Sequence, residues 1–150
     1  MTGRALIDSN ILVYAFDPAD RRKQEVALTL LDGLAAAQRG ALSTQILGEF
    51  FRVTTEKLTR RLSRAEAQRN VILFAAGWPV MPITSHVVLE AVRGAVAHAM
   101  PYWDAQLWAT ARLNQLEILL SEDFQDGRVT DGVRFVNPFA PAFDLAGLLA

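Results

Sequence analysis

The chain has 150 residues, of which 51% are hydrophobic and 21% charged, a composition that suits one folded domain with a sizeable core and excludes a disordered tail. Its formal net charge of −1 excludes a protein that grips nucleic acid through bulk positive charge, so a polyanion would be bound locally or through cations. Because the sequence has no cysteine, disulfides, thiolate catalysis and cysteine-based zinc sites are also excluded.

Apolar runs alternate with helical patterns in the first half of the chain, which is typical of an α/β fold with a parallel sheet. The first run, residues 4–8, predicts a buried central strand, and a short helical turn follows it. A longer helix is predicted over 21–37, after the turn DPAD. Residues 41–44 predict a second strand, and the apolar spacing in QILGEFFRVTTEKL predicts a helix over 45–58.

The second half continues this alternation. SRAE at 63–66 is a capping box ahead of another helix, and VMPI at 80–83 predicts a short third strand. Helices are predicted over 85–100 and 101–116, the second with Pro101 at its first position. Residues 118–121 and 133–139 predict two more strands, and the apolar tail 140–150 either packs back on the body or contacts a partner chain.

Two observations favour a cytoplasmic protein with no membrane contact. The N-terminus lacks the pattern of a signal peptide. Residues 70–89 carry no acidic or basic side chain except His86, but Gly77, Pro79 and Pro82 interrupt this stretch. It therefore fits a passage from helix to strand better than a membrane span.

Two carboxylates stand where the pattern predicts burial. Asp8 ends the first strand, in ALIDSNILVYAF, where an isolated buried carboxylate costs on the order of several kcal/mol. Asp104 lies on the apolar face of its predicted helix, and the helix dipole offsets only about 0.3–1 kcal/mol there. Both therefore need a partner, and a cation at the carboxyl edge of a parallel sheet is a natural one.

Further acids are expected at the same edge, Asp123 on the condition that the first and fourth strands are neighbours. Asp123 and Asp126 follow the fourth strand, and Glu49 lies near the start of the helix after the second. Such acids without basic partners repel one another, and Mg²⁺ or Mn²⁺ would relieve the repulsion, activate a water and stabilise phosphoryl transfer. Taken singly, each acid has an ordinary alternative, such as helix capping for Asp8 or a first-turn position for Asp104.

Five other acids and both histidines are interpreted as structural or solvated. Solvent, turns or helix ends are assigned to Glu122, Asp131, Asp17, Asp20 and Asp32. The two histidines, His86 and His98, are interpreted as ordinary helix residues.

Four segments, LIDSNILVYAFD, ILGEFF, YWDAQLWATA and LLSEDFQDG, together resemble the motif blocks of PIN domains, especially those of VapC-type toxins of bacterial toxin–antitoxin pairs. The resemblance runs from about Ala5 to Phe139. It implies a single domain over 1–150, a three-layer α/β/α sandwich with a central parallel sheet of about five strands, and Mg²⁺- or Mn²⁺-dependent ribonuclease activity. The catalytic, metal-binding acids that it implies are Asp8, Glu49, Asp104 and Asp123.

The resemblance also implies supporting residues and partners. Asn10 and Ser121 would orient substrate, water or a ligand carboxylate, and Asp126 would be an optional or supporting ligand. RNA is the implied substrate, a small antitoxin covers the acidic pocket, and the chain forms a homodimer. Basic residues in 57–64, KLTRRLSR, are candidates for contact with RNA or antitoxin, whereas Arg21, Arg22 and Lys23 fit a solvated helix end.

Three other classes of protein share part of this pattern. Phosphatases of the haloacid dehalogenase type need an acid two residues after Asp8, where this chain has Asn10. A receiver domain needs paired acids, a central Asp and a later lysine, and EILLSED does not supply that lysine. A degenerate PIN module that binds RNA or protein without catalysis stays open, although its retention of all four acids weighs against it.

Overall fold

A mostly parallel sheet lies at the centre of the computed structural model, which describes residues 3–150; Met1 and Thr2 of the predicted domain lie outside the described residues. The sheet has six strands within that range, in the order β3-β2-β1-β4-β6-β5. All pairs are parallel except that β5 runs antiparallel to β6. The strands are β1 (Ala5–Ile7), β2 (Gly40–Ser43), β3 (Val80–Met81), β4 (Ile118–Leu120), β5 (Val129–Thr130) and β6 (Val133–Val136).

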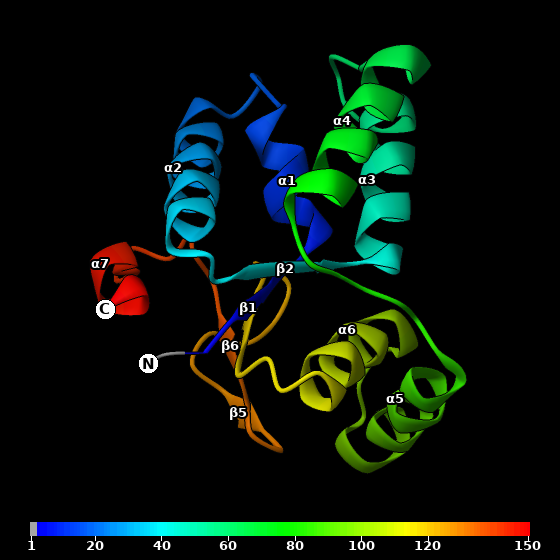
Figure 1. The fold of residues 1–150 in the computed structure, drawn as a ribbon. Coiled ribbons are helices and arrows are strands. Elements are labelled where there is room, and N and C mark those ends of the chain that lie inside the picture. The colour runs from blue at the N-terminus through cyan, green and yellow to red at the C-terminus, as the bar shows by residue number, and fades with distance from the viewer. Residues whose placement is uncertain (1–2) are drawn as a thin grey trace.

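Helices cover both faces of this sheet. Figure 1 shows α1 to α4 on one side and α5 and α6 on the other, so the predicted α/β sandwich is confirmed. The helices are α1 (Ser9–Ala15), α2 (Arg21–Ala37), α3 (Thr44–Glu56), α4 (Arg64–Gly77), α5 (Ser85–His98), α6 (Tyr102–Leu113) and α7 (Leu145–Leu149).

Local chemistry explains where several helices begin. Ser43 ends β2 and caps α3, because its hydroxyl accepts a hydrogen bond from the backbone N–H of Ile46 at 3.3 Å. Ser63 caps α4 through the N–H of Glu66 at 3.1 Å, as the SRAE pattern predicts. α1 and α3, which directly follow the parallel strands β1 and β2, therefore start at the carboxyl edge of the sheet.

Several boundaries differ from the predicted ones. β3 and β6 are shorter than predicted, because Pro82 and Pro138 follow them within one or two residues and cannot donate to a strand ladder. Pro101 is the N-cap of α6 rather than its first residue. The two-residue strand β5 was not predicted, so the sheet has six strands instead of about five.

The interior is closely packed. Gly94 of α5 faces the ring of Trp108 of α6, and a Cβ atom at position 94 would overlap that ring. A glycine is thus required where these two helices meet.

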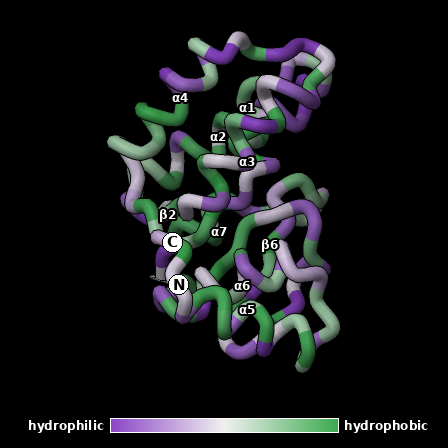
Figure 2. Tube along the Cα trace, turned by 90° about the vertical axis from the view of Figure 1, so that its right-hand side faces the viewer, coloured by the Kyte–Doolittle hydropathy of each residue, from purple (hydrophilic) through white to green (hydrophobic). Residues whose placement is uncertain are grey.

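Hydrophobic and hydrophilic stretches alternate along outer helices such as α4 and α5 (Figure 2). Over the described residues, no helix combines the length and apolar character needed to cross a membrane.

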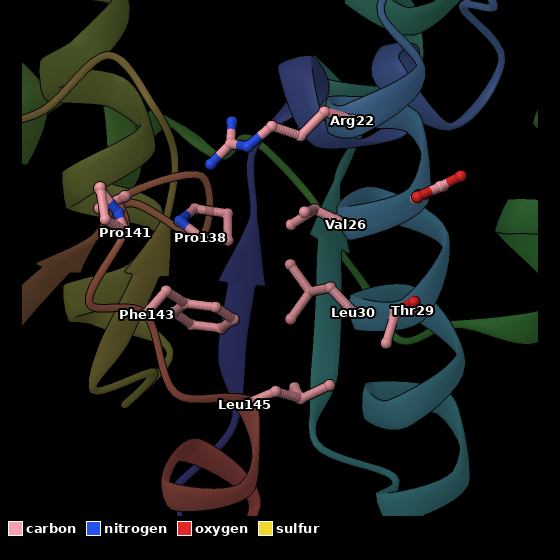
Figure 3. Close-up of a pocket in the computed structure, with 10 residues that line it drawn as sticks. Arg22, Val26, Thr29, Leu30, Pro138, Pro141, Phe143 and Leu145 are labelled. Carbon is pink, nitrogen blue, oxygen red and sulfur yellow. The ribbon is translucent and has the colours of Figure 1, made fainter.

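The C-terminal tail packs back on the body. Leu145 and Leu149 of α7 lie against Gly33 of α2, and Arg39 donates hydrogen bonds to the carbonyls of Leu148 and Ala150. Figure 3 shows the pocket of about 380 Å³ between α2 and this tail. None of the predicted site residues lines it.

Candidate active site

Two neighbouring strands bring Asp8 and Ser121 together. β1 and β4 are parallel, with Ile7 opposite Leu120, so the residues that follow them lie at one edge of the sheet. The Ser121 hydroxyl donates to Asp8 Oδ2 at 2.7 Å. Asp8 is only 3% exposed, and Ser121 is 1% exposed. The sequence predicted that Asp8 and the loop after the fourth strand share an edge if the first and fourth strands are neighbours. The structure confirms that β1 and β4 are neighbours.

Asp8 also caps α1, as the alternative interpretation from the sequence predicted. Its Oδ1 accepts a 2.6 Å hydrogen bond from the backbone N–H of Ser9. Burial raises the pKa of Asp8 to about 7; hydrogen bonds from Ser121 and Ser9 act against this shift, and the charges of Glu49 and Asp123 add to it. A carboxyl group in this position holds its charge only at a cost.

Glu49 reaches the same edge from α3. The hydroxyl of Ser9 donates to Glu49 Oε2 at 2.7 Å and lies 3.4 Å from Asp8 Oδ1, so it bridges the two acids. Gln45, one turn earlier on α3, donates to Glu49 Oε1 at 2.8 Å. Gln106 of α6 in turn donates to Gln45 at 2.8 Å, which ties α6 to the glutamate.

Asp104 and Asp123 complete the group. Asp104 lies half-buried in the first turn of α6, where desolvation raises its pKa and the charges of Asp123 and Glu49 raise it further. Asp123 is held by Asn10, whose amide donates to its Oδ2 at 3.2 Å. The same amide lies 3.2 Å from Ser121 Oγ and 3.4 Å from Asp8 Oδ2. Asp8 and Asp104 therefore each sense the charges of Glu49 and Asp123.

Asp126 has a different environment. It is exposed, and its Oδ1 accepts a 2.9 Å hydrogen bond from the backbone N–H of Asn137, just after β6. Neither a hydrogen bond nor a resolved charge effect joins it to the four acids within the described chain. In this arrangement Asp126 stabilises a turn.

The acidic group has no basic counterpart. Within residues 3–150, none of the four acids forms an ion pair with Lys, Arg or His. Glu122, between Ser121 and Asp123, does have a base. Its carboxylate is 2.8 Å from Lys23 Nζ and accepts a 2.6 Å hydrogen bond from the Tyr14 hydroxyl. Glu122 thus lies in a bend, as predicted, but its side chain is paired rather than simply solvated.

The chemistry of these groups fits a hard divalent cation. Every candidate donor is a carboxylate, hydroxyl or amide oxygen, which Mg²⁺ and Mn²⁺ prefer. The buried Asn10 Oδ1 is an acceptor without a hydrogen-bond partner among the described residues. As the side chains stand, however, no three acidic or histidine groups in residues 3–150 form a ready-made metal site. Both oxygens of Glu49 are engaged by Ser9 and Gln45 instead.

Sequence reasoning missed five residues around the site. For Gln45 a signal existed, because it lies four residues before Glu49 and thus on the same helix face. The others depend on contacts between distant segments, such as the 99-residue separation of Lys23 and Glu122. The residues missed are Ser9, Tyr14, Lys23, Gln45 and Gln106.

Comparison with known proteins identifies the family. A family model described as the PIN domain matches residues 5–130, so the chain belongs to the PIN domain family. Membership of this family argues against the haloacid dehalogenase and receiver-domain alternatives. A comparison with curated protein sequences gives no significant match.

Solved structures share the fold at low sequence identity. A toxin–antitoxin complex from Klebsiella pneumoniae is 21% identical with a TM-score of 0.64, covering 89% of this chain and 97% of that one. Mycobacterium tuberculosis VapC20, described as a sarcin–ricin loop cleaving toxin, is 16% identical with a TM-score of 0.60, covering 77% and 86%. VapBC2 from Rickettsia felis, bound to a promoter DNA fragment, is 14% identical with a TM-score of 0.60, covering 87% and 96%.

Proposed function

We propose that this chain is a metal-dependent endoribonuclease that hydrolyses RNA phosphodiester bonds, and that it is the VapC-type toxin of a type II toxin–antitoxin pair. The observation that carries the proposal is the meeting of four carboxylates at one sheet edge without a basic partner among the described residues. Asp8, Glu49, Asp104 and Asp123 are the proposed catalytic and metal-binding residues.

The similar structures support this activity. VapC20 is described as a toxin that cleaves the sarcin–ricin loop, and two further structures of the same fold are complexes of toxin–antitoxin systems. The chain shares the fold of these proteins over most of their length. We propose RNA cleavage like that of VapC20 for this chain, because its four acids supply the chemistry that such cleavage needs.

A bound Mg²⁺ or Mn²⁺ would supply Lewis-acid chemistry, lowering the pKa of a water molecule and neutralising charge on the scissile phosphate. Asp8 is the most constrained of the four proposed ligands, since Ser121 and Ser9 fix both of its oxygens. Glu49, Asp104 and Asp123 are more accessible and would turn toward the same centre. Asn10 would orient Asp123 through its amide N–H and offer its free Oδ1 to the site.

Two partner predictions accompany this function. A small antitoxin would cover the acidic pocket and place a basic side chain beside the four carboxylates. A homodimer is also proposed, and α5 offers a surface for it, because four apolar side chains on this helix are exposed: Val88, Leu89, Val92 and Val96.

A degenerate module that binds RNA or protein is the second candidate. It is favoured by one observation, the engagement of both Glu49 oxygens by neutral donors, which leaves no ready-made metal site in the described chain. The two candidates differ in whether the purified protein cuts RNA.

The test is direct cleavage with mapped ends. Purified protein is incubated with defined RNAs and Mg²⁺ or Mn²⁺, beside Asp8→Asn and Asp104→Asn variants and an EDTA control. We expect the wild type to cut at defined positions and both variants to lose at least about a hundredfold in rate, since metal stabilisation of the transition state amounts to several kcal/mol. Equal cleavage by wild type and variants would contradict the assignment, and an inactive wild type would favour the degenerate module.

A further inference from the structure

The segment that runs from the end of α3 into the start of α4 concentrates positive charge in a chain that is acidic elsewhere. Residues 52–69 contain six basic and two acidic side chains, a formal charge of +4, whereas the whole chain carries −1. The rest of the chain therefore has a formal charge of −5. All six basic residues are exposed. We call them the basic arm: Arg52, Lys57, Arg60, Arg61, Arg64 and Arg69.

The charges of the basic arm are not neutralised within the protein. None of its six members forms an ion pair with an acidic residue in the described range 3–150. Other basic residues do, since Lys23 pairs with Glu122, and Arg93 and Arg112 pair with Glu90. The two acids of the segment, Glu56 and Glu66, are exposed and leave the excess in place.

The turn between α3 and α4 is anchored to the hydrophobic core. Leu58 and Leu62 are partly buried against the hydrophobic core, and the N–H of Leu62 donates to the carbonyl of Thr54 at 2.9 Å. The guanidinium carbon of Arg64 lies 5.2 Å from the ring centroid of Phe51. Arg60 and Arg61, which lie between Leu58 and Leu62, consequently extend into solvent from an anchored backbone. An anchored backbone lowers the entropic cost of binding a ligand.

Helix α3 connects the arm to the acidic site. Glu49 lies in its second turn, and Arg52 follows three residues later on the same side. Lys57 is eight residues beyond Glu49, about 12 Å along a helix axis. Figure 1 shows α3 and α4 side by side, with their connecting turn at the end remote from the sheet. Glu49 and the arm thus lie at successive positions along α3 and the turn that follows it.

We infer that the basic arm binds the phosphate backbone of single-stranded RNA and leads it along α3 to the four carboxylates. This inference rests on the proposed nuclease function. A polyanion whose cleavage site enters an acidic pocket is repelled there, and cations on the adjoining helix turn offset that repulsion. Outward-facing arginines spread along a surface fit a backbone of regularly spaced phosphates, and such contacts carry no base preference.

The test compares two pairs of charge removals. Arg60→Gln/Arg61→Gln is introduced into the non-cleaving Asp8→Asn background, beside the control Arg128→Gln/Arg134→Gln, which removes two exposed arginines near the β5–β6 edge. Fluorescence anisotropy with a labelled single-stranded RNA in EDTA gives the affinity at several salt concentrations. We expect the arm variant to bind at least about tenfold more weakly, with a salt slope smaller by about 1.4, since each phosphate contact contributes about 0.7. The control should match the parent.

Other outcomes overturn the inference. Unchanged RNA affinity in the arm variant, equal losses in both variants, or a parent that does not bind RNA would each do so. Cleavage by the Asp8-containing protein is measured separately. If it cuts RNA while the arm variant binds normally, only this inference fails; if RNA binds through the arm and is not cut, only the nuclease proposal fails.

Discussion

The Ser121 hydroxyl donates a 2.7 Å hydrogen bond to Asp8 Oδ2, across the ends of the neighbouring parallel strands β1 and β4. Both side chains are almost completely buried. The bond fixes the direction of the carboxylate that sits deepest in the candidate site. The same hydroxyl also positions Asp123, because it accepts a 3.1 Å hydrogen bond from the backbone N–H of Asp123.

Removing that hydroxyl should impair cleavage more than folding. Ser121→Ala leaves Asp8 in place but frees it to rotate, and loss of a residue that orients a metal ligand typically lowers activity about 10–100-fold. Initial cleavage rates against Mn²⁺ concentration would measure this. Ser121→Thr keeps the hydroxyl and is the control. If Ser121→Ala cleaves as fast as wild type, Ser121 does not position Asp8 for the reaction.

The folding stability of the metal-free protein should fall as pH rises between the pKa values of Asp8 in the unfolded and folded states. Its pKa is about 7 in the folded protein against 3.8 in the unfolded chain, so the unfolded chain binds fewer protons between these values. Asp8 therefore destabilises the folded state progressively from pH 4 to 7, by up to about 4 kcal/mol for a shift of three units.

The measurement is urea unfolding in EDTA at several pH values. Asp8→Asn should remove this part of the pH dependence and be more stable than wild type above pH 7. Because Glu90 and Asp131 have lowered pKa values and act in the opposite direction, the difference between variant and wild type is the quantity to compare. A wild-type protein more stable than Asp8→Asn at pH 8 would contradict the prediction.

The Lys23–Glu122 pair should hold the loop that carries Asp123. Lys23→Met leaves the half-buried Glu122 carboxylate beside Asp123 without its counter-charge, so we expect slower cleavage and a loss of about 1 kcal/mol in unfolding free energy. Lys23→Met/Glu122→Gln should recover part of both, as a double-mutant cycle measures. Strictly additive effects on the cleavage rate would show that the pair does not act as a unit.

Two glycine substitutions should change stability in opposite directions. Gly94→Ala places a Cβ against Trp108 and should destabilise the fold by about 1–3 kcal/mol. Gly48→Ala, on the exposed face of α3 with open space around it, should stabilise by about 0.5–1 kcal/mol. Thermal unfolding of both variants checks the prediction. Stabilisation by Gly94→Ala would mean that α5 and α6 are packed less closely than described.

The order of elements was predictable because local patterns determine it. Leu6 and Ile7 are fully buried, as a continuous apolar run predicts for a central parallel strand. The placement of Asp8, Glu49 and Asp123 at the carboxyl edge follows from the alternation of strand and helix, since parallel strands end at one edge.

Other features were predictable in principle and were missed. Asp131 and Gly132 have φ values of 45° and 82°, the conformation of a tight hairpin turn, and Asp-Gly is a strong sequence signal for it. The β5 strand beside it has only two residues, too few for a period-two pattern.

The partners of Glu122 were not predictable, because Lys23 and Tyr14 meet it only once the chain is folded. Their sequence separations are 99 and 108 residues, beyond any local pattern. Likewise, no sequence pattern indicates that Ser9 bridges Asp8 and Glu49, since that contact depends on how α1 and α3 pack.

Titration calorimetry of Mn²⁺ into the purified protein tests most directly whether the four carboxylates form one cation site. Wild type should bind Mn²⁺ and gain thermal stability from it, whereas Asp8→Asn and Asp104→Asn should bind far more weakly and gain little. In the wild type, the Asp126 carboxylate accepts a hydrogen bond from the backbone of Asn137. The variant Asp126→Asn should therefore bind Mn²⁺ like wild type. Absence of Mn²⁺ binding by the wild type, or unchanged binding by Asp8→Asn and Asp104→Asn, would contradict the account.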